Sequence, residues 1–267
     1  MKKVLGLVLT FVLSLTLISS VGAEGVDNSK IQTPEDYISY LESKEAVQSL
    51  DMNRNNGEAT ETSLFIDKFK NLPREQQEKF VEYISGPELL EGIVAADTPE
   101  KKQALTEKYN GDLSIGSSKL VADESLKASE FILSNTLASV GLSPLAVGDS
   151  WPYTFHNDQP YTLFGLDFIK TGIYLQIQVK TVATNTSQVI AINYAYGALL
   201  QNYYPGANLT INNAINPFIS DDKYRATKLV TWQWNFLWKG LGATIGTIEQ
   251  TITGDKTGHG TFSERIL

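Results

Sequence analysis

The sequence predicts an α+β protein, with a small N-terminal helical bundle followed by an antiparallel β-sandwich or barrel-like domain. Two patterns lead to this prediction: the first half repeats a helix-start signal, and the second half alternates apolar and polar residues with a period of two. A break in charge near Ser150 separates the halves. Residues 24–150 carry a net charge of −11, whereas residues 151–267 carry +1.

Residues 1–23 have the order of a cleavable secretory signal peptide. Lys2 and Lys3 precede an uncharged apolar stretch, Val4 to Ile18, and small residues follow up to Ala23. The stretch is shorter than the roughly 20 residues that a membrane-spanning helix needs. We therefore expect cleavage after Ala23 and release of a soluble, secreted, extracellular protein with no stable membrane anchor.

The composition excludes several classes of chemistry. The chain has no cysteine, so disulfides, thiolate metal sites and thiol catalysis are excluded, which also fits export from a Gram-positive bacterium. A chain of this length can hold itself together by burial alone. The 30 acidic residues outnumber the 22 basic ones. An overall negative field disfavours nucleic acid as a partner.

The N-terminal half is expected to form short helices, each with one apolar stripe. Proline followed by acidic residues suits a first helical turn, because proline has no N–H to leave unpaired and the helix dipole favours negative charge there. Such starts occur at Pro34, Pro73, Pro87 and Pro99, and a further helix is expected over residues 61–71. We assign residues 24–140 to an acidic helical region and residues 141–150, which contain Gly and Pro, to a linker.

Residues 151–267 are expected to form an antiparallel β domain. Apolar and polar residues alternate over 173–180, 189–196 and 229–238, and again over 248–252. Glycines between the last two stretches predict a hairpin. Within 189–196 the alternation places Ile192, Tyr194 and Tyr196 on one face of a strand.

The most unusual local feature is the run of aromatic side chains on one face of the stretch 229–238. Trp232, Trp234 and Trp238 alternate there with polar residues. Burial in the sheet core is the interpretation that the pattern favours, because large aromatics dominate cores. The alternatives are a stacking platform for sugar rings and a membrane or oligomer contact. If the run forms such a platform, these three tryptophans are the candidate ligand-binding residues.

No catalytic residue, metal ligand or cofactor site is predicted. The segment Gly258-His259-Gly260-Thr261 shares its His-Gly-Thr with the catalytic histidine region of subtilisin-like proteases, but no nucleophile segment accompanies it. His156 has no partner motif, and the calcium-like loop from Asp51 has its glycine and its final acid out of register. Carboxylates brought together by the fold stay an alternative for glycoside hydrolysis. The acids concerned are Asp158, Asp167, Asp221, Asp222 and Glu249.

Two stretches carry a family resemblance. They are residues 65–84, which read FIDKFKNLPREQQEKFVEYI, and the Trp-rich C-terminal region that closes on Gly-His-Gly-Thr-Phe-Ser-Glu264. In both, the chain resembles secreted proteins of uncharacterised function from spore-forming Gram-positive bacteria. The resemblance implies an extracellular product and transfers no site residues.

Three functional hypotheses follow. The first is a secreted, non-enzymatic binding or surface-interaction protein whose partner is cell-wall polysaccharide or another secreted or surface macromolecule. The second is a secreted toxin or antimicrobial precursor whose acidic helical half is a pro-segment. The third is an extracellular hydrolase with acids assembled by the fold.

Overall fold

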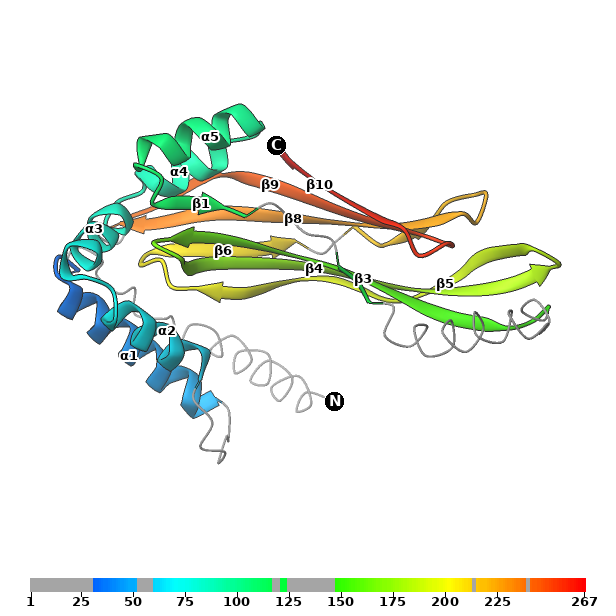
Figure 1. Cartoon of the computed structure of the whole chain (residues 1–267), viewed down its shortest axis with the longest axis horizontal. Helices are drawn as coiled ribbons and strands as arrows, with labels where there is room; N and C mark the ends of the chain where they lie inside the picture. Colours follow the sequence, from blue (N-terminus) through cyan, green and yellow to red (C-terminus); the bar gives the residue numbers. More distant parts are fainter. Residues whose placement is uncertain (1–30, 52–59, 117–120, 124–146, 213–214, 239–240) are drawn as a thin grey trace, which may run out of the picture.

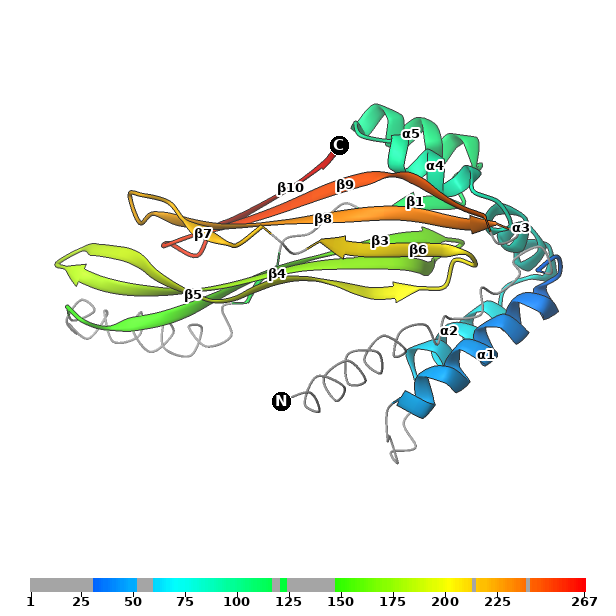
Figure 2. The ribbon, with the colours of Figure 1, turned by 180° about the vertical axis from the view of Figure 1, so that it is seen from behind.

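The computed structural model describes residues 31–51, 60–116, 121–123, 147–212, 215–238 and 241–267. The expected signal peptide with Ala23, most of the calcium-like loop and residues 141–146 of the expected linker lie outside these ranges. The molecule is elongated: its sheets run along the long axis and its helices gather at one end (Figures 1 and 2). None of the described helices has the length and apolar character needed to cross a membrane.

The helices begin where the sequence predicts. They are α1 (Pro34–Asp51), α2 (Glu61–Lys70), α3 (Arg74–Ile84), α4 (Glu88–Ala95) and α5 (Pro99–Lys108). Threonine hydroxyls cap three of them, because Thr33 accepts from the N–H of Asp36 at 3.2 Å, Thr60 from that of Ser63 at 3.0 Å and Thr98 from that of Lys101 at 3.3 Å. The helices also pack on strands: α4 contacts β9 (Leu241–Asp255), and α2 contacts β4 (Leu166–Ala183).

The strands form two open antiparallel sheets, which confirms a mixed α and β protein with antiparallel sheets. The first sheet has the order β1-β3-β4-β5, with β2 also paired to β3, and the second has the order β10-β9-β8-β6, with β7 also paired to β8. The remaining strands are β1 (Leu113–Ile115), β2 (Val121–Asp123), β3 (Ser150–Leu163), β5 (Thr186–Asn202), β6 (Ala207–Asn212), β7 (Phe218–Ile219), β8 (Arg225–Trp238) and β10 (Gly260–Ile266). Strands β1 and β2 lie in the stretch expected to be helical, and both pair with β3.

The predicted alternation holds in β8 and fails in β5. In β8 the face that carries Trp232 and Trp234 is buried, and β8 pairs with β9 as the expected hairpin. In β5 the register with β4 shifts between Gln176 and Ile177. This bulge turns Ile192 inward opposite Ile177, while Tyr194 points outward opposite Gln176.

A chain of aromatic rings joins the helices to both sheets. Tyr37 of α1 lies 5.5 Å from Phe80 of α3, which meets Phe168 of β4 edge-on at 6.5 Å. Phe168 in turn lies 5.8 Å from Tyr204, whose ring is 6.2 Å from Phe236 of β8. Distances are between ring centroids, and all five side chains are buried. Edge-to-face packing of this kind stabilises beyond area burial.

Two buried tyrosine hydroxyls satisfy backbone carbonyls at the same junction. The Tyr37 hydroxyl donates to the carbonyl of Tyr203 at 2.9 Å, and the Tyr204 hydroxyl donates to that of Gly86 at 2.5 Å. Each bond links a helical segment to the loop after β5. Because a buried polar group without a partner is costly, these bonds also fix the position of the helices.

A polar bridge crosses between the sheets at Gln250 of β9. Its Oε1 accepts from the Trp232 indole N–H at 2.8 Å, and its Nε2 donates to the Thr171 hydroxyl of β4 at 3.2 Å. The same Nε2 lies 3.2 Å from Glu264, which also pairs with Lys102 of α5 at 3.2 Å. Gln250 therefore ties β8, β9, β10 and β4 together within the core.

We predict that Gly246→Ala destabilises the protein by about 1–3 kcal/mol through overpacking. A methyl group at Gly246 of β9 would come 2.4 Å from Cγ1 of Val94, on α4. The free energy of unfolding, measured by urea denaturation, checks this. The double variant Gly246→Ala/Val94→Ala should be more stable than the sum of the two single variants implies; strict additivity would contradict the contact.

Candidate functional site

Two of the three candidate ligand-binding tryptophans, Trp232 and Trp234, lie in the core. Trp232 and Trp234 are each 1% exposed, so neither indole presents a face to solvent. Core burial, the interpretation that the pattern favours, therefore describes these two residues, and the alternative of a stacking platform does not fit them. The cause is the facing sheet, since Tyr161 of β3 packs edge-on against Trp234 at 5.2 Å. The side chain of Trp238 lies outside the described part.

A group of neighbouring aromatic residues that face outward lies on the first sheet. Tyr174 of β4 stacks on Tyr196 of β5, with ring centroids 4.9 Å apart and planes 20° from parallel. Tyr194 lies 5.9 Å from Tyr196, and His156 of β3 stacks on Tyr174 at 5.9 Å. Tyr194 and Tyr196 are 39% and 45% exposed. We call these four residues the tyrosine face.

Side-chain amides accompany the tyrosine face on the same strands. Gln176 donates to the Thr154 hydroxyl at 2.9 Å, and Asn193 donates to the Gln176 oxygen at 3.0 Å. Asn193 is also 3.4 Å from the Gln178 oxygen. These bonds hold the amides in fixed orientations, so donors and acceptors lie at set positions beside the rings.

Tyr174 is positioned by a glycine and a carboxylate. A Cβ at Gly172 would come 2.9 Å from the ring and hydroxyl of Tyr174, so the glycine leaves room for the ring. The hydroxyl donates to Asp158 at 3.1 Å, and Asp158 also pairs with Lys170 at 3.3 Å. Burial, followed by the charge of Asp158, raises the pKa of Tyr174, so the hydroxyl stays a donor at neutral pH.

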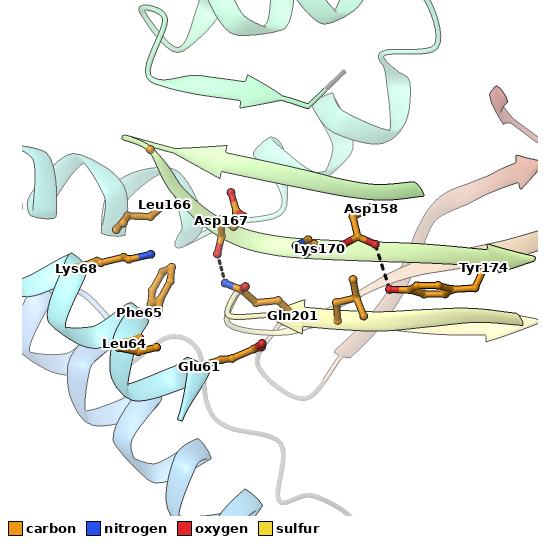
Figure 3. Close-up of a pocket in the computed structure, with 12 residues that line it drawn as sticks. Glu61, Leu64, Phe65, Lys68, Asp158, Leu166, Asp167, Lys170, Tyr174 and Gln201 are labelled. Atoms are coloured by element: carbon orange, nitrogen blue, oxygen red, sulfur yellow. Dashed lines mark hydrogen bonds and ion pairs between the residues drawn. The ribbon is translucent and has the colours of Figure 1, made fainter. Parts of the chain in front are cut away.

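A pocket adjoins the tyrosine face where α2 meets β4. We call it the junction pocket; its volume is about 440 Å³, within the range of about 300–1,000 Å³ for small-molecule sites. Figure 3 shows α2 on one side, with β4 and Gln201 of β5 on the other. It is lined by Glu61, Leu64, Phe65, Lys68, Asp158, Gly165, Leu166, Asp167, Lys170, Tyr174, Leu200 and Gln201. Tyr174 thus belongs to both the pocket and the face.

The other residues singled out by the sequence do not form a shared centre. His259 lies in the turn between β9 and β10, where its ring is 2.8 Å from the Thr257 hydroxyl, whereas His156 lies on the tyrosine face. Of the five candidate acids that the sequence offers for hydrolysis, only Asp158 and Asp167 line the junction pocket. Glu249 pairs with Arg265 at 2.7 Å. Within the described ranges, no cluster of three or more His, Asp or Glu side chains could hold a metal ion.

Sequence reasoning missed Tyr194 and Tyr196 as outward residues. The alternation in 189–196 put them on the same face as Ile192, and a bulge in the ladder cannot be seen in one strand alone. Gly172 was a signal in the sequence that a side chain packs closely over this strand, because a glycine inside an apolar strand often marks a close approach by another group.

We predict that Trp232→Phe lowers the free energy of unfolding by about 1–3 kcal/mol more than Trp234→Phe does. The first change leaves the buried Gln250 oxygen without its indole donor. The second is a matched control, because the Trp234 indole nitrogen has no hydrogen-bond partner within the described structure. Equal losses in guanidinium denaturation would show that the indole–amide bond contributes nothing.

We predict that Gly172→Ala displaces the ring of Tyr174 at little cost in stability, because the clashing atoms lie at the far end of that side chain. Cross-peaks between the rings of Tyr174 and Tyr196 in NMR spectra should weaken. Tyr174→Phe is the control: it loses the hydroxyl bond but keeps the ring, so ring contacts should persist. Unchanged Tyr174–Tyr196 cross-peaks in Gly172→Ala would disprove the positioning role of Gly172.

Comparison of the chain with protein-family models, with curated proteins and with solved structures returned no match. The site itself has a distinct chemistry. That chemistry combines stacked, half-exposed tyrosines, oriented amides and an adjoining charged pocket on one sheet.

Proposed function

We propose that this chain is an extracellular, non-enzymatic binding protein that holds a cell-wall polysaccharide on its tyrosine face. The observation that carries the proposal is the stack of Tyr174 on Tyr196 beside Tyr194. Exposed aromatic side chains are ordinary when scattered, but neighbouring ones on one surface mark an interaction site.

Sugar rings match this surface in their chemistry. A pyranose ring has a face of C–H groups, which packs on an aromatic ring, and an edge of hydroxyls, which needs donors and acceptors. Tyrosine supplies an apolar body with a polar tip. Gln176, Gln178 and Asn193 supply the amides, which already have fixed orientations. A polysaccharide can therefore stack and hydrogen-bond at the same time.

The sheet presents these groups at low entropic cost. His156, Tyr174 and Tyr196 come from three adjacent strands, so the backbone hydrogen bonds between strands set their spacing. Tyr side chains have few rotatable bonds, and the stack restricts them further. A rigid surface loses little freedom on binding, which raises affinity for a given contact area.

We also propose that the two open sheets pack as a β-sandwich and that the helices form a bundle, which covers one end of the sheets. Support comes from the single hydrophobic core to which both sheets and all five described helices contribute. In this arrangement the tyrosine face is the solvent side of the first sheet.

The alternative functions stay predictions. For the hydrolase, Asp158 and Asp167 share the junction pocket, but Asp158 pairs with Lys170 and Asp167 accepts from the Thr162 hydroxyl at 3.0 Å. For the toxin precursor, residues 141–146 of the expected linker between the acidic helical region and the β domain lie outside the described part.

We predict that Tyr196→Ala weakens binding to insoluble peptidoglycan by roughly tenfold, the loss typical of truncating a central aromatic contact. Tyr194→Ala should weaken binding less, because its ring lies at the end of the stack. Retention of the purified protein on peptidoglycan, measured as a binding isotherm, checks both.

Tyr224→Ala is the matched control. Tyr224 is 39% exposed, the same as Tyr194, but it lies in the turn before β8 on the other sheet. It should bind as the unaltered protein does. Wild-type protein that is not retained on any cell-wall polysaccharide would overturn the proposal, as would equal losses in Tyr196→Ala and Tyr224→Ala.

A further inference from the structure

The junction pocket lies directly beside the tyrosine face, because the Tyr174 ring stacks on Tyr196 and its hydroxyl contacts Asp158. A glycan held on the stack therefore has the pocket within reach. The pocket walls come from α2 and from β3, β4 and β5, which the aromatic junction holds together (Figure 3).

The charges that line the pocket do not all cancel. Asp158 and Lys170 pair with each other. Three charged groups remain: the Lys68 ammonium and the carboxylates of Glu61 and Asp167. Within the described structure the side chains of Lys68 and Glu61 make no hydrogen bond or ion pair. The pocket therefore offers one cationic contact and two anionic contacts.

Apolar side chains separate these charges. Phe65 and Leu166 are buried and form part of the wall, and Leu64 on α2 is 49% exposed. A large aliphatic side chain left open at a pocket suits a ligand that also has aliphatic carbon. The matching ligand therefore carries both signs of charge on a short carbon chain.

We propose that the junction pocket binds a zwitterionic peptide branch attached to the glycan. The free carboxylate of the branch pairs with Lys68, and its ammonium pairs with Glu61 and Asp167. This inference rests on the proposed function and adds the ligand class: peptide-bearing rather than plain polysaccharide.

Other ligand chemistries fit less well. A simple anion would meet two carboxylates at the same pocket, where like charges repel it. A neutral sugar in the pocket would hydrogen-bond to Lys68 and Glu61 through its hydroxyls but would supply no opposite charge to either, and charge-assisted hydrogen bonds between two ions are stronger. A group with both charges satisfies all three residues.

Calorimetric titration with two soluble probes tests the proposal. One is chitotetraose, which has no peptide; the other is a disaccharide tripeptide whose branch has a free ammonium and a free carboxylate. The wild-type protein should bind the peptide-bearing probe roughly fivefold to tenfold more tightly, as expected for a few partly exposed ion contacts. In Lys68→Gln this ratio should fall to about twofold because the cationic contact is lost.

Lys70→Gln is the matched control on the same helix. Lys70 is exposed and pairs with Glu42 of α1 at 3.4 Å, so the change removes the same charge away from the pocket. The ratio should match that of the wild type. A probe with its branch ammonium acetylated should also lose part of its advantage, which tests the contacts with Glu61 and Asp167.

The outcomes separate this inference from the proposed function. Equal binding of the two probes by the wild type overturns the peptide branch while the polysaccharide site stands. Binding of neither probe overturns both. If the ratio of the two affinities falls equally in Lys68→Gln and Lys70→Gln, the preference for the peptide-bearing probe comes from net charge. That result would overturn the proposed role of the pocket.

Discussion

Aromatic packing at the helix–sheet junction is the constraint on which the other features depend. Tyr37, Phe80, Phe168 and Tyr204 form one buried series that runs from α1 to the loop after β5. The chain has no cysteine, so no disulfide can link these elements and this packing holds them together. Phe65 of α2 joins the series through Phe80, at 6.3 Å between ring centroids, which places α2 beside β4, where the junction pocket lies.

The protein uses its large aromatic residues in two separate ways. Trp232 and Trp234 fill the space between the sheets, where their loss would leave cavities. Tyr174, Tyr194 and Tyr196 lie on the opposite side of the first sheet, where hydroxyl groups stay near water. Because the two sets are on different faces, substitutions in the outer set can change binding without removing core packing.

Local signals in the sequence were sufficient to predict the helices and β8, but they were insufficient to predict the candidate site. A proline and acid pair acts within one turn, and in β8 buried residues alternate with less buried ones from Leu229 to Leu237, so both can be recognised along the chain. Strands β1 and β2 have three residues each and pair with a distant strand, so they carry too little periodicity to be recognised. The junction pocket combines α2 with β4 across about one hundred residues, a pairing that only tertiary contacts define.

The bulges between β4 and β5 affect more than the direction of side chains. Strand β5 is the last strand of its sheet in the described structure, and the outer backbone groups of an edge strand are in general a template to which another chain can add. The register with β4 shifts at four places along this strand. Each shift twists and interrupts the edge, which disfavours pairing with a second copy. The irregularity that exposes the tyrosines therefore also disfavours fibrous self-association.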